Sequence, residues 1–378
     1  VGSEMCIRDR FCLNAGMSPT IKIVLAVVTY LLWDTCYTLC DAPIFALPTA
    51  MTSSVKERSS FMTVGTVGGS LAAALATVFL VPYAENNGYL KAAIIVAVVS
   101  FLAMSLISLF GKERYKVKEE VLEKPASLRD TWEYLIHNKY LLYFYAYRMI
   151  SGSIAVSMLI YVAKYCLGDV KYMSMVVAIS VIPICILFLF SGKIFKRFDK
   201  IVVYRFCMIA TILMNAITLF VGYQNRTLAI ACLVVIAVLA ILPSILMGAI
   251  PQDCVEYGTY KTETRKEGIT FALQTFANKL TAAVATIITG GVLTFVGYDV
   301  AAEKAATEAH KVVEIAVSQA TVSGMWKASF IVPIIGQLLA IGFLFAYNLR
   351  DKDVQIMSDC NAGKITKAEA EALLSRKY

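Results

Sequence analysis

The sequence predicts an all-α protein that crosses a lipid bilayer several times. Of its 378 residues, 58% are hydrophobic and only 16% are charged, whereas about a quarter of the residues in soluble domains are charged. Apolar runs long enough to span a bilayer recur along the chain, since a spanning helix needs about twenty such residues. A segment in lipid must satisfy its own backbone hydrogen bonds, so we expect every run to be helical.

Nine spans are predicted from the points where the apolar runs begin and end. Each is the length of one membrane-crossing helix, and they cover roughly 21–40, 61–82, 90–110, 140–163, 173–192, 201–222, 227–251, 269–298 and 324–348.

The beginning of the chain differs from the rest. Residues 1–10 (VGSEMCIRDR) are polar and do not start with Met. They resemble translated sequencing-adapter read-through, so we interpret them as a non-native segment. Because the number of spans is odd and no initiator Met precedes them, we expect three helices of the first half to be missing from this sequence.

Basic residues indicate the orientation and the division of the chain. Alternate loops contain 22 Lys and Arg in one set and 7 in the other, and cytoplasmic loops carry the excess. We therefore expect a multi-pass protein of the cell membrane with a cytoplasmic C-terminus. The longest connector of the first set, 111–138, would join three helices of a first lobe (11–110) to a six-helix lobe (139–348), followed by a cytoplasmic tail (349–378).

Composition argues against several other classes. The net charge is +8, but the basic residues form no continuous patch, so a nucleic-acid partner is not expected. Most of the ten cysteines fall in apolar spans without a CxxC pair, and only two histidines are present. A zinc site, a His-based catalytic triad and hence an enzyme are not expected.

Polar residues in the first predicted span suggest a sugar pocket. Trp33, Asp34, Tyr37 and Asp41 fall within an arc of about 100° on one side of a helix. Carboxylates accept paired hydrogen bonds from vicinal hydroxyls, and aromatic faces pack on the apolar face of a pyranose ring. The alternative is structural: Asp41 would cap the turn at Pro43, and Asp34 would be solvated near the interface.

Two cations lie within later spans. Lys279 is roughly 15 Å along its helix, with Thr275 one turn before it, and an ionisable group at that depth suggests function. An ion pair that fixes one lobe to the other is the alternative. Arg148 is roughly 12 Å deep, from where it could still extend to the interface. Asp34 and Arg148 remain candidate coupling residues or charge partners.

The predicted loop 252–268 alternates acids and bases, among them Asp253, Glu256 and Arg265. One interpretation is a solvated loop. The other is a cytoplasmic gate whose ion pairs form in one state of a carrier and break in the other. The spacing of the charges does not choose between them.

Two stretches resemble one known family. WDTCYTLCDAPIFALPTAMTSSVKER (33–58) and DCVEYGTYKTETRKEGITFALQTFANK (253–279) are similar to the signatures of the glycoside–pentoside–hexuronide:cation symporters. The resemblance implies a major-facilitator fold of twelve helices, of which nine are present here.

The same resemblance implies roles for individual residues. Asp41 matches the sugar-binding aspartate of the family, and Trp33 and Tyr37 lie beside it. Lys279 matches a lysine near the sugar and cation sites. Gln274 and Thr275 match positions that line the same cavity.

The sequence also departs from the family pattern. It reads VGTVGG where members often have an arginine that contributes to sugar binding. The cation-binding acids of the family lie in an early helix that is absent here, so no metal site can be identified.

The expected function is therefore symport of a sugar or glycoside, coupled to Na⁺ or H⁺ and working by alternating access between two lobes. The alternative is a carrier of the same family for a non-sugar solute, such as an amphiphile or a drug-like compound. No cofactor is expected besides the coupling cation, and a monomer in the bilayer is the expected state.

Overall fold

The structure is a computed structural model whose described residues form two compact units, Val1–Glu123 and Lys124–Tyr378. The described residues are 20–21, 24–25, 27–32, 34–36, 64–65, 68–69, 71–73, 75–80, 83–84, 87–110, 128–154, 158–262, 267–299, 317–361, 363–376 and 378.

In the first unit, the most complete element is helix α5 (Tyr89–Phe110), which corresponds to the predicted span 90–110. Gly88 precedes it with φ of 90°, a conformation that glycine adopts without a steric penalty. A short π-helix, η1 (Ala76–Leu80), lies before it. Large side chains such as Val99 and Phe101 are exposed along α5, as is usual for a helix whose surroundings are lipid or other helices.

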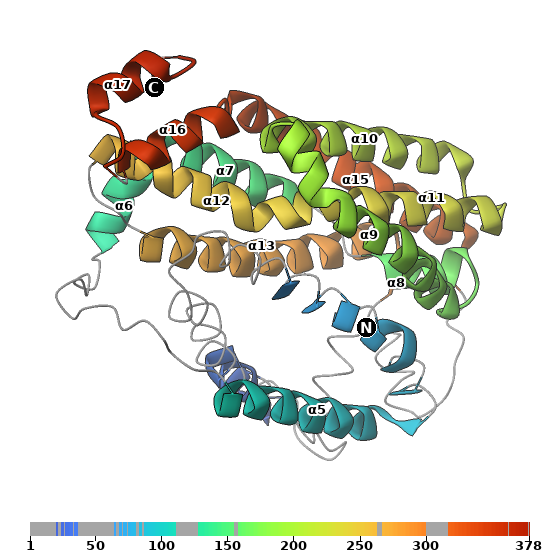
Figure 1. Ribbon diagram of the computed structural model, residues 1–378. Helices are drawn as coiled ribbons and strands as arrows, with labels where there is room; N and C mark the ends of the chain where they lie inside the picture. The colour runs from blue at the N-terminus through green and yellow to red at the C-terminus, as the bar shows by residue number, and fades with distance from the viewer. Residues whose placement is uncertain are drawn as a thin grey trace. The chain divides into compact units, whose positions relative to one another are not determined.

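The second unit consists of helices alone among its described residues (Figure 1). In chain order they are α6 (Leu128–His137), α7 (Lys139–Ser153), α8 (Leu159–Tyr161), the π-helix η3 (Val162–Cys166), α9 (Lys171–Arg197), α10 (Lys200–Val221), α11 (Arg226–Leu239), α12 (Ile241–Thr262), α13 (Glu267–Phe295), α15 (Gln319–Ala346), α16 (Asp351–Asn361) and α17 (Lys367–Leu373).

Five helical stretches of this unit are long and apolar enough to cross a membrane, by length and composition. They are Lys171–Phe195, Lys200–Val221, Arg226–Thr262, Ala272–Phe295 and Gln319–Ala346. The prediction of an all-α polytopic membrane protein is therefore confirmed, while the number of nine spans stays a prediction.

Several helices begin where a polar side chain caps the first turn. Asn138, Asn225 and Ser318 accept hydrogen bonds from backbone N–H groups of α7, α11 and α15. Thr366 and Glu369 form a reciprocal capping box on α17. These side chains satisfy N–H groups that have no partner within the helix.

The long helices run between two ends of the unit, and α11 and α12 follow one another in the same direction as one apolar stretch, Arg226–Thr262. At one end, Lys200 at the start of α10 contacts Asp253 of α12 and Asp351 beyond α15. We call this the tail end, because α16 and α17 pack there (Figure 1). At the opposite, far end, the hydroxyls of Tyr165 and Tyr298 are 2.9 Å apart. Each end has its own cluster of buried apolar side chains.

Two predicted boundaries were wrong in the second unit. The predicted span 140–163 is not one helix, because α7 ends at Ser153 and α8 and η3 follow. Ser and Gly at 151–153 are weak helix formers, so an apolar run can be interrupted there. The predicted loop 252–268 is helical as far as Thr262, because charged residues end an apolar run without ending a helix.

The predicted tail 349–378 contains two helices and is folded onto the unit. Asp353 of α16 is buried and accepts hydrogen bonds from Ser375 N at 2.9 Å, Ser375 Oγ at 2.5 Å and Tyr378 Oη at 2.5 Å. Burial favours the neutral acid, but these hydrogen bonds outweigh burial and leave the pKa of Asp353 below its usual value. The buried carboxylate of Asp353 thus binds the residues that follow α17 to helix α16.

Candidate functional site

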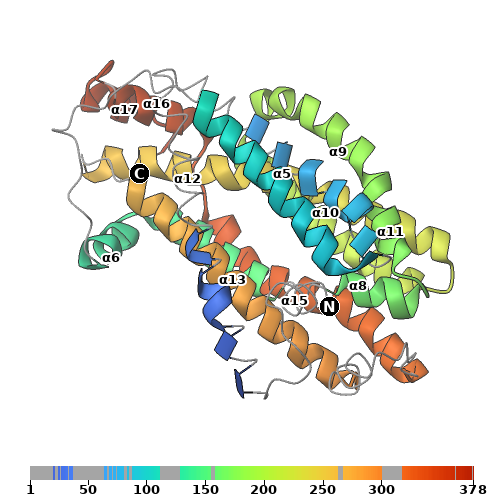
Figure 2. The same ribbon diagram turned by 90° about the horizontal axis from the view of Figure 1, so that it is seen from below.

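Helix α13, labelled in Figure 2, packs against α7 and α12. Lys279 lies on its exposed side. Thr275 is on the same side, one turn earlier. Small or hydroxyl-bearing residues continue this exposed stripe (Ala272, Ala282, Ala283, Thr286 and Gly290), and the large apolar side chains of Phe276 and Ile287 lie exposed along its edge. Faces with small and polar residues meet other helices or water-filled cavities, whereas lipid-facing surfaces are large and apolar. The stripe is therefore suited to a cavity or a partner helix.

Gln274 lies on the other side of α13, toward α12. Its Nε2 donates a hydrogen bond to the carbonyl oxygen of Met247 at 3.3 Å. Its Oε1 is buried and has no hydrogen-bond partner among the described residues. The structure thus separates Gln274 from Thr275 and Lys279, which the resemblance placed in one cavity.

Arg148 of α7 is half-buried, and its Nε has no hydrogen-bond partner among the described residues. The hydroxyls of Tyr147 and Tyr204 lie close enough to interact electrostatically with its guanidinium group. A buried Nε does not fit a side chain that extends fully to the interface.

The structure does not bring Arg148 and Lys279 together. A Cβ placed on Gly152 of α7 would be 2.5 Å from Thr281 Cγ2 and 4.0 Å from Arg148 Nη1, so Arg148 lies on the side of α13 that carries Thr281. Thr281 follows Lys279 by two residues, which is about 200° around a helix. The two cations therefore lie on opposite sides of α13.

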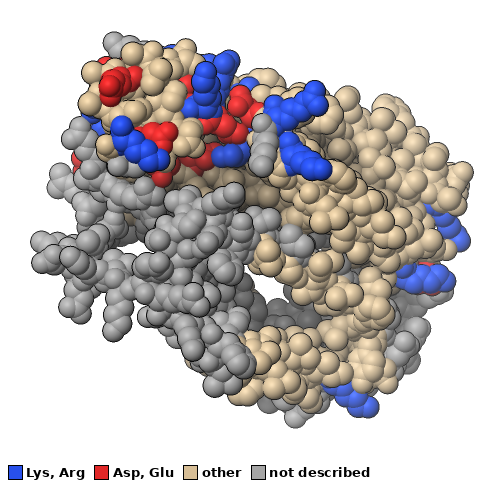
Figure 3. All heavy atoms as spheres, in the orientation of Figure 1, with Lys and Arg blue, Asp and Glu red and all other residues tan. Residues whose placement is uncertain are grey.

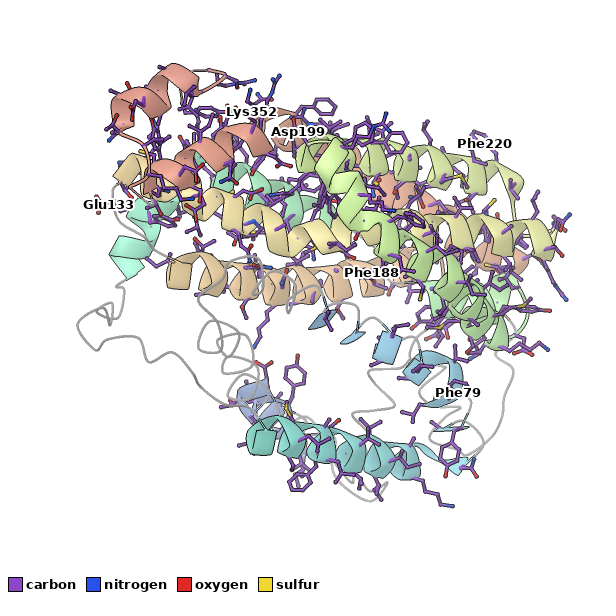
Figure 4. All side chains as sticks on the ribbon, viewed as in Figure 1. Phe79, Glu133, Phe188, Asp199, Phe220 and Lys352 are labelled. Atoms are coloured by element: carbon purple, nitrogen blue, oxygen red, sulfur yellow. The ribbon has the colours of Figure 1, made fainter. Side chains whose placement is uncertain are left out.

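The predicted gate residue Asp253 belongs to an ion-pair network at the tail end. Lys200 Nζ is 2.7 Å and 2.6 Å from the two oxygens of Asp253, and 3.7 Å from Asp351 Oδ1. The backbone N–H of Lys200 also donates to Asp351 Oδ2 at 3.0 Å. One lysine thus joins α10, α12 and α16. Figure 4 labels Asp199, next to Lys200, and Lys352, next to Asp351.

Glu256, the second predicted gate residue, also binds the tail. Asn361 Nδ2 of α16 donates to the carbonyl oxygen of Glu256 at 3.0 Å and to its Oε2 at 2.9 Å. Asn138, which caps α7, donates to the carbonyl oxygen of Cys254 at 2.7 Å. Figure 3 shows charged side chains gathered over α16 and α17, while the described surface of α10 and α11 is largely uncharged.

The remaining predicted site residues lie in or next to the part of the chain that is not described. Trp33, Tyr37, Asp41 and Arg265 are outside the described residues. Asp34 is described, half-buried, in a helical turn of the first unit. Among the described residues, no group of three or more His, Cys, Asp or Glu could hold a metal ion, and the acids of the cation site stay a prediction.

Sequence reasoning missed Lys200, Asp351 and Asn361, which complete the network around α12. In the sequence, Lys200 lies between the predicted spans 173–192 and 201–222, and the other two lie in the predicted tail 349–378. A sequence signal was present, because Asp199-Lys200 directly precedes an apolar run, where an N-cap and a first turn are expected. The sequence does not indicate which distant residues Lys200, Asp351 and Asn361 contact.

Comparison with known proteins identifies the family. The family model described as MFS/sugar transport protein matches residues 11–351. The chain is 27% identical to the uncharacterized symporter YjmB of Bacillus subtilis over 76% of this chain. It spans 64% of that relative, which is less than two thirds of its length.

Two further relatives are more completely covered. The chain is 26% identical to a putative sulfoquinovose importer of Escherichia coli, with 92% of this chain and 72% of the relative aligned. It is also 26% identical to a putative 2,3-dihydroxypropane-1-sulfonate exporter of Salmonella typhimurium, over 92% and 75%. The family predicted from the two sequence stretches is thereby confirmed. The chain belongs to the family of MFS/sugar transport proteins.

Proposed function

We propose that this protein is a secondary active transporter that takes up a sugar or glycoside together with Na⁺ or H⁺ by alternating access. The observation that carries the proposal is the family match over residues 11–351. A relative named as a symporter and another named as an importer support coupled uptake. The excess of Lys and Arg in alternate loops supports a cytoplasmic tail end in the cell membrane. We propose a monomer as the active form.

We propose that Asp41, Trp33 and Tyr37 contribute to substrate binding. From the second unit, α13 would contribute Lys279 and Thr275 from its exposed stripe. An ammonium group at the centre of a spanning helix costs about 2.5–3.5 kcal/mol on insertion scales, and such groups face the bundle interior or water. The small residues around Lys279 support that orientation.

We further propose that Asp253 and Glu256, with Arg265, control the cytoplasmic opening. Asp253 and Glu256 hold α12 to α10 and α16 within one unit. A helix fixed in this way would move with its lobe as a rigid body. These residues would then control the opening by fixing the position of α12, and not by forming ion pairs within the predicted loop 252–268.

The proposal is tested by transport in vesicles with the full-length protein and its Asp41→Asn variant. An amide replaces one of two acceptors by a donor, and a lost hydrogen bond to a charged group costs about 1.5–3 kcal/mol. We expect sugar affinity to fall about tenfold or more and concentrative uptake to be lost. Asp169→Asn, which alters an exposed acid, is the control. Wild-type uptake by Asp41→Asn would refute the assignment, and no sugar uptake by the unmodified protein would refute the function.

A carrier of a non-sugar solute is the second candidate. The relative named as a 2,3-dihydroxypropane-1-sulfonate exporter favours it, since that solute is not a sugar. Exchange of labelled solutes across vesicle membranes, first with sugars and then with short-chain polyol acids, separates the two candidates. Exchange of the polyol acids alone would favour the second.

A further inference from the structure

A small pocket lies at the tail end of the second unit, between α12 and the two tail helices. Its volume is about 280 Å³, close to the lower limit of about 300 Å³ for pockets that hold small ligands. It lies within one compact unit. The residues that line it are Thr259 and Tyr260 of α12, Cys360 and Asn361 of α16, and Lys367 of α17.

The hydroxyl of Tyr260 is the feature that suggests a ligand. Tyr260 is only 6% exposed, and its Oη is buried without a hydrogen-bond partner among the described residues. The polar groups beside it are paired, since Thr259 Oγ1 donates to the carbonyl oxygen of Val255 at 2.9 Å and Asn361 Nδ2 donates to Glu256 Oε2 at 2.9 Å. Buried polar atoms are nearly always paired, so this hydroxyl requires a partner.

Lys367 gives the pocket a positive charge. Its Nζ lies over the Tyr260 ring, 5.9 Å from the centroid, and its side chain is exposed. A lysine side chain is flexible, so it can move aside from the ring while its ammonium group binds an anion. Glu371, one turn later on α17, is close enough to interact electrostatically with Tyr260. An anionic ligand that also carries a hydroxyl or an amine would match both charges.

The pocket lies at the depth where lipid headgroups are expected. Thr259 and Tyr260 are in the last turn of the apolar stretch Arg226–Thr262, and the end of a spanning helix lies at the membrane–water interface. Basic pockets on the cytoplasmic side of spanning helices can bind the phosphate of a headgroup. Soluble phosphate esters reach the same depth from the water.

Phosphate fits the donors better than a carboxylate does. It offers three oxygens, so an ammonium group and a hydroxyl can each bind a different one. Lysine is a common phosphate ligand because it acts as a point charge that needs no fixed geometry.

We propose that this pocket binds the phosphate group of a small polar molecule, with phosphate oxygens on Lys367 Nζ and Tyr260 Oη. The molecule is a phospholipid headgroup or a soluble phosphate ester, which share this chemistry. Bound there, it would hold α17 to α12 and so strengthen the attachment of the tail. The site lies outside the proposed substrate site, and its test does not depend on transport.

Binding calorimetry on the purified full-length protein in detergent tests the site. The probes are glycerol 3-phosphate and a short-chain phosphatidic acid, which carry the same phosphate without and with acyl chains. Glycerol and sodium acetate are the comparison compounds. We expect at least one phosphate probe to bind about tenfold or more tightly than both of them. Preference for glycerol 3-phosphate would assign a soluble ester, and preference for the phosphatidic acid a headgroup.

Variants and a labelling experiment place the bound phosphate. Lys367→Gln should weaken the preferred probe about tenfold, and Tyr260→Phe should weaken it several-fold. The control is Lys364→Gln, because Lys364 is 67% exposed in its pair with Asp359 and does not line the pocket. Bound probe should also slow alkylation of Cys360, followed by mass spectrometry of the peptide that contains it.

Several results would overturn the proposal. It is wrong if neither phosphate probe binds, if glycerol or acetate binds as tightly, or if Lys364→Gln weakens binding as much as Lys367→Gln. If Tyr260→Phe does not fold, an unchanged affinity in Lys367→Gln or an unchanged alkylation rate of Cys360 refutes it as well. Each of these results leaves the proposed transport function intact.

Discussion

Replacing Lys200 by Met is expected to destabilise the tail end. Lys200 and Asp253 are 24% and 13% exposed, and Lys200 Nζ is 2.6 Å from Asp253 Oδ2. Removing one partner of a buried ion pair costs about 3–5 kcal/mol, whereas an exposed pair is worth about 0–1 kcal/mol. Because this pair is close to the buried limit, we expect a loss of about 2–4 kcal/mol.

Most of that loss should come from Asp253. In Lys200→Met, Asp351 keeps the hydrogen bond from the Lys200 backbone N–H, but both oxygens of Asp253 lose their donor. Adding Asp253→Asn removes the unpaired charge. The double variant should therefore be more stable than Lys200→Met alone.

Thermal unfolding of the purified protein in detergent measures the effect. A loss of this size corresponds to a fall in Tm on the order of 5–10 °C. The control is Lys171→Met, because Lys171 is 70% exposed in its pair with Asp169, and its Tm should hardly change. Equal Tm values for Lys200→Met and Lys171→Met would refute the reasoning, as would a double variant that is less stable than Lys200→Met.

Three other predictions concern packing, pH and charge. Gly336→Ala should destabilise the unit by about 1–3 kcal/mol, seen as a lower Tm, because the new Cβ would lie 2.6 Å from Ile154 Cβ; an unchanged Tm would contradict this. Since the pKa of Asp353 is lowered, its stabilisation of the tail should be complete above its unfolded pKa of about 4 and be lost as the pH falls through its lower, folded-state pKa. Limited proteolysis should therefore show the tail protected near neutral pH and increasingly cleaved as the pH is lowered into the acidic range, and Asp353→Asn should remove this dependence. Lys279→Met should insert normally and lose coupled sugar uptake, measured in vesicles; wild-type uptake would assign Lys279 a structural role.

The positions and lengths of the apolar runs in the sequence predicted the long helices well. The predicted spans at 173–192, 201–222 and 324–348 each fall on a long apolar helix of the structure. This worked because a spanning segment must be apolar over its whole length, so the signal is local and continuous. It failed at α7, which ends at Ser153, and at α12, which continues to Thr262, because hydropathy reports burial in lipid and not where a helix stops.

For the candidate site, the sequence identified residue types but not their neighbours. Lys279 and Gln274 were expected in one cavity, and the structure places them on different sides of α13. Asp253 was expected in a loop, and it is bound to Lys200 from a helix. Helical spacing shows which residues of one helix share a face, whereas the choice of partner depends on how helices pack.

By itself, the sequence determined that this chain is an all-α membrane protein of the sugar-transport family, because composition, span length and two signature stretches are local properties. Only the tertiary structure decided which polar atoms are paired. Lys200 finds Asp253 and Asp351 from distant segments, while Arg148 finds no acid among the described residues. The physical reason is that a charge in a low-dielectric bundle is governed by groups within a few ångströms, and those groups come from helices far apart in the chain.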